Sequence, residues 1–151
     1  MSDLVELIIT RLASPPGSDE LNKAILDSAF VFEKHRGVPP AGWSEEVVAT
    51  PVTDADVQRL KAALVEFIDR GGHGSWSLGK AYDPSLIPVF CRVLRRELDG
   101  GGDGHELYQA MIAVDNLGED VFGDRSLMTH LDDDDYRALA RAYLSRYDEA
   151  R

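Results

Sequence analysis

Clusters of proline and glycine divide this chain into short apolar segments, and this division is the strongest constraint on its fold. The clusters stand at residues 15–17, 37–42, 71–74 and 100–104, where they end or interrupt a helix. Between them, apolar side chains recur at helical spacings of three and four residues, and no segment shows the alternation typical of a strand. The sequence therefore predicts an all-α fold.

Capping residues mark the start of several predicted helices. Ser18, Thr53, Asp83 with Pro84, and the run Asp132 to Asp135 each place an oxygen acceptor before an apolar face. The predicted faces run from Leu4 to Leu12, Leu21 to Phe32, Val57 to Ile68, Leu86 to Leu98, Leu107 to Leu117 and Tyr136 to Leu144, with one short turn at Leu127, Met128 and Leu131. Residues 37–52 are expected to form a loop that Trp43 packs onto the body.

The net charge of −11 limits the partners that the chain attracts. Residues 1–75 hold 7 basic and 12 acidic side chains, and residues 76–151 hold the remaining 9 and 15, so neither half offers a basic stripe. A phosphate backbone or an anionic membrane would be repelled, whereas a basic partner protein would be attracted. An acidic surface also serves solubility alone.

Length and composition fit a single globular domain. The chain has 151 residues, of which 44% are hydrophobic, and its apolar runs are shorter than a membrane span. No secretory signal pattern opens the sequence, so a cytoplasmic location is expected. The single cysteine, Cys91, lies in an apolar stretch and is expected in the core.

The segment Gly71–Lys80 gives an ambiguous signal. Its glycines oppose a helix by about 1 kcal/mol each relative to alanine, so propensity alone predicts a loop with one helical turn. Leu78-Gly79 and Leu117-Gly118 nevertheless stand 39 residues apart, since 117 − 78 = 39, and each pair precedes a polar turn and another apolar segment. A period near 40 residues is typical of stacked helix pairs.

With this spacing, the stretch from Asp69 to Leu98 resembles HEAT-like, armadillo-type repeat proteins. The resemblance implies a short α-solenoid of antiparallel helix hairpins in a right-handed superhelical stack, within one domain over 1–151. Residues 1–52 would form an N-terminal hairpin and loop, and residues 53–151 would form the repeats. It also implies a helix over Gly71–Lys80, whose glycines would let a partner approach closely.

No set of residues converges on catalysis or cofactor binding. His105-Glu106 begins a helical zinc-protease pattern that lacks its second histidine. The loop Asp99 to Gly104 has the composition of a calcium loop but lacks the required glutamate, because that position is Ala110. The sequence has no nucleophile elbow and no phosphate loop. We therefore expect a protein that is not an enzyme and holds no cofactor or metal.

The resemblance and the charge together favour a protein-binding module. Small acidic HEAT-like proteins resemble bacterial immunity proteins, which neutralise a toxin by covering its site. The alternatives are a scaffold or regulatory subunit of a cellular enzyme, and a HEAT-like lyase or ligand-binding protein. The predicted partner surface follows the second helices of the repeats and their turns, and consists of His73, Trp76, Tyr108, Asp115, Asn116, Glu119 and Asp120.

Overall fold

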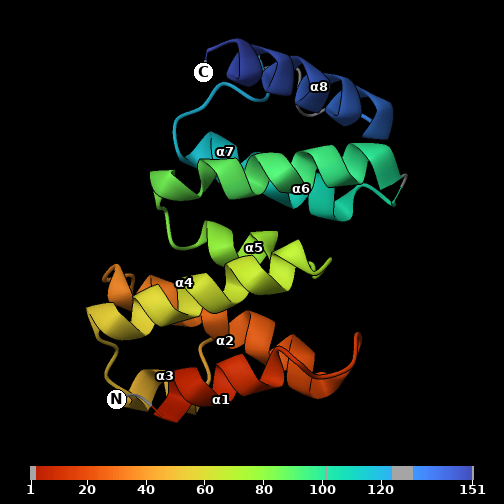
Figure 1. Cartoon of the computed structure of the whole chain (residues 1–151). Coiled ribbons are helices and arrows are strands. Elements are labelled where there is room, and N and C mark those ends of the chain that lie inside the picture. The colour runs from red at the N-terminus through yellow and green to blue at the C-terminus, as the bar shows by residue number, and fades with distance from the viewer. Residues whose placement is uncertain (1–2, 101, 124–130, 151) are drawn as a thin grey trace. The chain divides into compact units, whose positions relative to one another are not determined.

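The chain folds into helices (Figure 1). The computed structural model describes residues 3–100, 102–123 and 131–150, and all regular structure in these ranges is helical. The predicted all-α fold is thereby confirmed. The chain divides into two compact units, Met1–Ala81 and Tyr82–Arg151. The turn expected at Leu127 and Met128 lies outside the described residues.

The first unit is organised around its longest helix. It contains α1 (Asp3–Arg11), α2 (Asp19–His35), α3 (Glu45–Ala49), α4 (Asp54–Asp69) and α5 (Ser75–Gly79). Helix α2 contacts each of the other four, and α1 and α5 both also contact α4. Its core is apolar, with fully buried side chains that include Val5, Ile8, Val31, Phe32, Leu60, Leu64, Ile68 and Leu78.

The second unit is organised around α6. The 3-10 turn η1 (Pro84–Leu86) leads directly into α6 (Ile87–Gly100), which is followed by α7 (His105–Asn116) and α8 (Asp133–Glu149). Helix α6 contacts η1, α7 and α8, and α7 also contacts α8. The apolar core of this unit includes Phe90, Leu94, Leu107, Met111 and Val114. Cys91 is buried, as predicted.

The helix starts that the sequence predicts are confirmed. Ser18 accepts a hydrogen bond from the backbone N–H of Leu21. Thr53 and Asp132 each form a reciprocal capping box with the aspartate three residues later. Asp83 accepts from the N–H of Ser85, one residue after Pro84. These bonds satisfy donors that would otherwise have no partner at the first turn of a helix.

The prediction of an unbroken loop over residues 37–52 is wrong, because α3 lies within it. This helix has only 5 residues, too few to show helical periodicity or to be stable alone. Ser44 caps its start. At its other end the Lys34 ammonium group donates to the carbonyl oxygens of Val47 at 2.8 Å, Val48 at 2.9 Å and Thr50 at 2.7 Å. Thus a side chain of α2 holds α3 in place.

The glycine-rich segment follows the propensity argument rather than the continuous helix that the resemblance implies. Residues 71–74 are not helical, and α5 covers only Ser75–Gly79. Helix α4 ends at Asp69 with Arg70 as its C-cap, and the next residue, Gly71, has φ +101°. The N–H groups of Gly71 and Gly72 donate to the carbonyls of Ile68 and Phe67. This pattern is the Schellman motif, and its left-handed residue explains why glycine occupies position 71.

Substitution of Lys34 by methionine tests how far α3 depends on this ammonium group. We expect Lys34→Met to lower the free energy of unfolding by about 2–3 kcal/mol, because three carbonyl oxygens lose a charged donor at once. Urea denaturation measures the change. Lys61→Met on α4 is the control and should cost less than about 1 kcal/mol. Equal effects of the two substitutions would show that α3 does not depend on Lys34.

Candidate functional site

The first unit contains an apolar hollow beside the glycine-rich segment. Its volume is about 300 Å³, and it lies at the start of α2, near the end of α4 and along residues 71–73. The lining residues are Pro16, Gly17, Leu21, Asn22, Ile25, Phe67, Gly71, Gly72 and His73. His73, one of the seven residues predicted from sequence, is exposed at this site. The glycines therefore border a concave surface, as their predicted role requires.

The close approach of Gly72 to Phe67 shapes the hollow. A Cβ atom built on Gly72 would lie 2.6 Å from the Phe67 ring, which is less than any van der Waals contact. The backbone at residue 72 therefore lies directly against the ring, and only glycine fits without displacing it. A second hollow of about 450 Å³ shares Pro16, Phe67, Gly71 and Gly72. The same contact thus borders two concave surfaces of this unit.

Trp76 occupies α5 and is half-buried. The Lys80 ammonium group lies 5.4 Å from the centre of its ring, within the range of a cation–π interaction. The next residue, Ser77, donates from its hydroxyl group to the Ile25 carbonyl on α2 at 2.6 Å. Trp76 therefore belongs to a helix that is fixed to α2, and part of its ring remains accessible.

The second unit has a hollow around Tyr108. Its volume is about 330 Å³, and its lining includes Asp103, Gly104, His105, Tyr108, Leu131, Asp132, Asp133 and Tyr136. The rings of Tyr108 and Tyr136 lie 4.9 Å apart, and Phe122 contacts both edge-on. Burial raises the pKa of Tyr136, and the neighbouring Tyr108 adds to this shift.

The carboxylates around this second hollow already serve the ends of helices. Asp103 accepts from the N–H of His105, and Asp132 accepts from the N–H of Asp135. Asp133 accepts from the Arg137 guanidinium at 2.8 Å. Each acid is thus explained by capping or by an ion pair within the unit. The three acids are exposed, whereas Tyr108 and Tyr136 are half-buried.

The remaining predicted residues lie in the last turn of α7 and in the segment that comes after it. Asp115 and Asn116 form its last turn, and Asn116 is exposed while Asp115 is half-buried. Glu119 accepts a hydrogen bond from the Tyr143 hydroxyl group at 3.0 Å. Asp120 accepts from the N–H of Gly123 through its side chain and from Arg146 through its carbonyl. Glu119 and Asp120 therefore attach the segment after α7 to α8.

Tyr143, which donates to Glu119 from α8, is buried. It is 4% exposed, and burial raises the pKa of its hydroxyl group strongly. The neighbouring Cys91 and the hydrogen bond to Glu119 act in the same direction. Sequence analysis placed Tyr143 only on an apolar face. Its partner Glu119 is distant in sequence, so no local pattern indicated the bond.

The seven predicted residues divide between the two units. His73 and Trp76 lie in the first, and Tyr108, Asp115, Asn116, Glu119 and Asp120 lie in the second. His73 and Tyr108 each line a hollow. The sequence did not indicate Phe67, Asn22 or Tyr136 as lining residues, although an aromatic residue within one helical turn of a helix-ending glycine, as Phe67 is of Gly71, was a usable signal.

The described residues contain neither a cluster suited to a metal ion nor a helix suited to spanning a membrane. Across residues 3–100, 102–123 and 131–150, no three His, Cys, Asp or Glu side chains gather in positions suited to a metal ion. Glu106 of the incomplete zinc-protease pattern is buried and lies 3.9 Å from an Arg96 guanidinium nitrogen. No helix in these ranges combines the length and apolar content needed to cross a bilayer.

Comparison with known proteins gives no relative from which a function is transferable. No protein-family model, no curated protein and no solved structure matches this chain.

Alanine at position 72 tests the close approach of the backbone to Phe67. We expect Gly72→Ala to lower the free energy of unfolding by about 1–3 kcal/mol, because the new methyl group forces the ring to move. Gly100→Ala is the control, since its Cβ would have no neighbour within 4 Å, and it should raise stability by up to about 1 kcal/mol. Thermal or urea unfolding of both variants measures the difference. A harmless Gly72→Ala would show that the ring moves freely.

Tyr143 is predicted to make stability depend on pH in alkaline solution. In the unfolded chain its hydroxyl group ionises near pH 10, whereas its pKa in the folded protein is higher. Its contribution to stability is therefore complete below about pH 10 and is lost as the pH rises above that value. Urea unfolding between pH 8 and about pH 11 should show this loss in the wild type and a smaller loss in Tyr143→Phe.

The same variant tests the hydrogen bond to Glu119. At neutral pH, Tyr143→Phe should lower the free energy of unfolding by about 1–2 kcal/mol, because the bond lies in a buried site. If the variant and the wild type had parallel pH profiles up to pH 11, the raised pKa of Tyr143 would not contribute to stability.

Proposed function

We propose that this protein is a non-enzymatic binding module for a basic partner protein. The observation that carries the proposal is which charged side chains have partners within the protein and which face solvent alone. Most described lysine and arginine side chains have a partner within their own unit, whereas many of the described carboxylates face solvent without one. This distribution adds to the net charge of −11 and would attract a positively charged partner.

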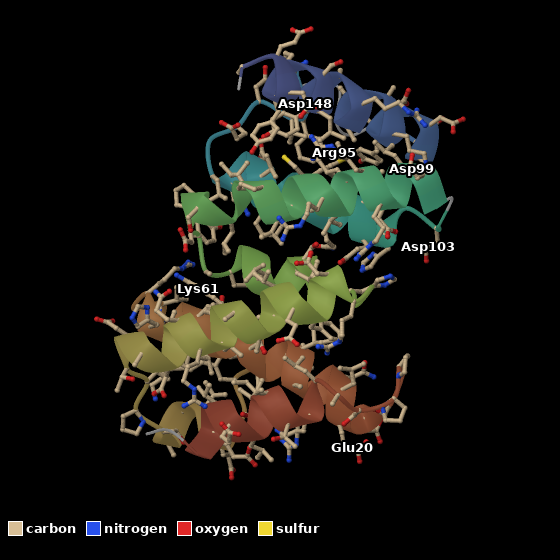
Figure 2. The ribbon with its side chains drawn as sticks, in the orientation of Figure 1. Glu20, Lys61, Arg95, Asp99, Asp103 and Asp148 are labelled. Atoms are coloured by element: carbon tan, nitrogen blue, oxygen red, sulfur yellow. The ribbon has the colours of Figure 1, made fainter. Side chains whose placement is uncertain are left out.

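Most lysine and arginine side chains in the described ranges have a partner inside their own unit. Some donate to backbone carbonyls, as Lys34, Arg137 and Arg146 do. Others pair with carboxylates, and Figure 2 shows Arg95 of α6 and Asp148 of α8 directed toward one another. Those with such partners are Lys23, Lys34, Arg36, Arg59, Arg70, Lys80, Arg95, Arg96, Arg137 and Arg146.

Carboxylates, by contrast, remain on the surface of both units. Asp19 and Glu20 are exposed in the first turn of α2, and Figure 2 labels Glu20. In the second unit Asp99 and Asp134 are exposed at the end of α6 and the start of α8. An approaching basic protein therefore meets uncompensated negative charge on either unit.

The specific function that we propose is neutralisation of a cognate toxin, as bacterial immunity proteins do. The HEAT-like pattern around Leu78-Gly79 and Leu117-Gly118 supports this proposal together with the acidity. A scaffold or regulatory subunit of a cellular enzyme is the second candidate, because it would use the same kind of surface. A HEAT-like lyase or ligand-binding protein is the third, and the hollows at His73 and Tyr108 would serve it.

Affinity purification tests the proposal directly. The tagged protein is incubated with lysate of its own cells at low and at high salt, and bound proteins are identified by mass spectrometry. We expect one stoichiometric basic partner whose binding weakens as salt rises. If that partner is toxic when expressed alone, the immunity role is supported. A partner of acidic or neutral charge, or none at either salt concentration, would contradict the proposal.

A matched pair of substitutions at Asp120 measures the contribution of surface charge. Asp120→Asn keeps an acceptor for the N–H of Gly123 but removes the charge, whereas Asp120→Lys reverses the charge and removes the acceptor. We expect the association rate with the purified partner to fall about twofold for Asp120→Asn and up to about tenfold for Asp120→Lys. Unchanged rates in both would exclude Asp120 from the partner surface.

A further inference from the structure

The apolar hollow beside residues 71–73 in the first unit has a different lining from the hollow around Tyr108. Leu21, Ile25 and Phe67 give it an apolar lining, and Gly71 and Gly72 contribute backbone without side chains. We propose that this hollow receives one bulky apolar side chain, aromatic or aliphatic, from a basic segment of the partner protein. This inference rests on the proposed function and names the chemistry that the partner must present.

The size and the shape of the hollow suit a single side chain. A volume of about 300 Å³ lies at the lower end of the range for ligand sites. The absence of a side chain at Gly72 preserves its shape, because a Cβ atom there would lie 2.6 Å from the Phe67 ring. An anchor of this kind, buried in a small pocket, is typical of the residues that dominate binding between proteins.

The surroundings of the hollow favour a protein over a small molecule. Leu26 is 46% exposed and follows Asn22 by one turn of α2, so the apolar surface continues beyond the rim. Leu26 is therefore available to contact a residue that flanks the anchor. A small ligand confined to the hollow would leave Leu26 in water.

The exposed acids beside the hollow favour a partner segment that carries positive charge. Asp19 and Glu20 are exposed in the same turn of α2 as Leu21, which lines the hollow. Among the described residues that line the hollow, only His73 is ionisable. Arg70, which lines the adjacent hollow, pairs with Glu66 at 3.4 Å. Lysine or arginine residues beside the apolar anchor would meet Asp19 and Glu20.

Two synthetic peptides separate the apolar contribution from the charge. One has four lysines around a central tryptophan, and the other has alanine in place of the tryptophan. Amide NMR spectra of the full chain report binding at Gly71, Gly72 and His73. We expect the tryptophan peptide to shift these three signals and to bind at least about tenfold more tightly than the alanine peptide.

Two tryptophan substitutions locate the effect. Asn22 is exposed and lines the hollow, so Asn22→Trp covers the hollow without removing a core residue. Gln58 is exposed on α4 in the same unit and lines neither hollow of this unit, so Gln58→Trp is the matched control. We expect Asn22→Trp to reduce binding of the tryptophan peptide to the level of the alanine peptide, and Gln58→Trp to leave it unchanged. Circular dichroism confirms that both variants are folded.

The outcomes distinguish this inference from the proposed function. Equal binding of the two peptides, or binding that Asn22→Trp does not alter, would overturn the apolar anchor while leaving attraction to basic proteins intact. Shifts at Gly72 that follow the concentration of the protein alone would identify a second copy of the chain as the occupant and would also overturn it. Anchor binding that is confirmed while no basic partner is captured from lysate would contradict only the proposed function.

Discussion

Within each unit of this protein, lysine and arginine side chains of one helix donate hydrogen bonds to the last backbone carbonyls of a neighbouring helix. Lys34 reaches from α2 to the end of α3. Arg137 reaches from α8 to the carbonyls of Glu97 at 3.0 Å and Gly102 at 2.8 Å, at the end of α6. The last carbonyls of a helix have no partner within it, so a charged donor from another helix satisfies them and also fixes how the two helices pack.

This use of cations links the stability of the fold to its surface charge. A lysine or arginine that donates only to backbone carbonyls forms no ion pair with a carboxylate, so the nearby acids stay unpaired by it. Lys34 and Arg146 illustrate this, because their partners are backbone oxygens. The same constraint makes the protein sensitive to small changes, since an ammonium group that serves three carbonyls has no local substitute.

Interactions close in sequence account for what sequence analysis predicted correctly. The caps at Ser18 and Thr53 depend on residues within one turn, and the stop at Gly71 depends on backbone conformation alone. Helix α3 was missed because its stability comes from Lys34, 13 or more residues away. Buried Asp27 was also missed, although its ion-pair partner Lys23 is only four residues away, because the sequence does not show which helices cover that side of α2.

The candidate site shows the same division between local and distant information. His73 was assigned to the partner surface because the resemblance implies a helix over Gly71–Lys80. Residue 73 is not helical, yet it lines a hollow. Glu119 was assigned to the partner surface from its charge, yet it accepts a bond from buried Tyr143 in α8. A carboxylate that supports the fold and one that faces a partner look identical in sequence, because the difference lies in a contact across the unit. Surface assignments from charge alone therefore require the packed structure, and the missed aromatic residues Phe67 and Tyr136 show that the lining of a hollow requires it too.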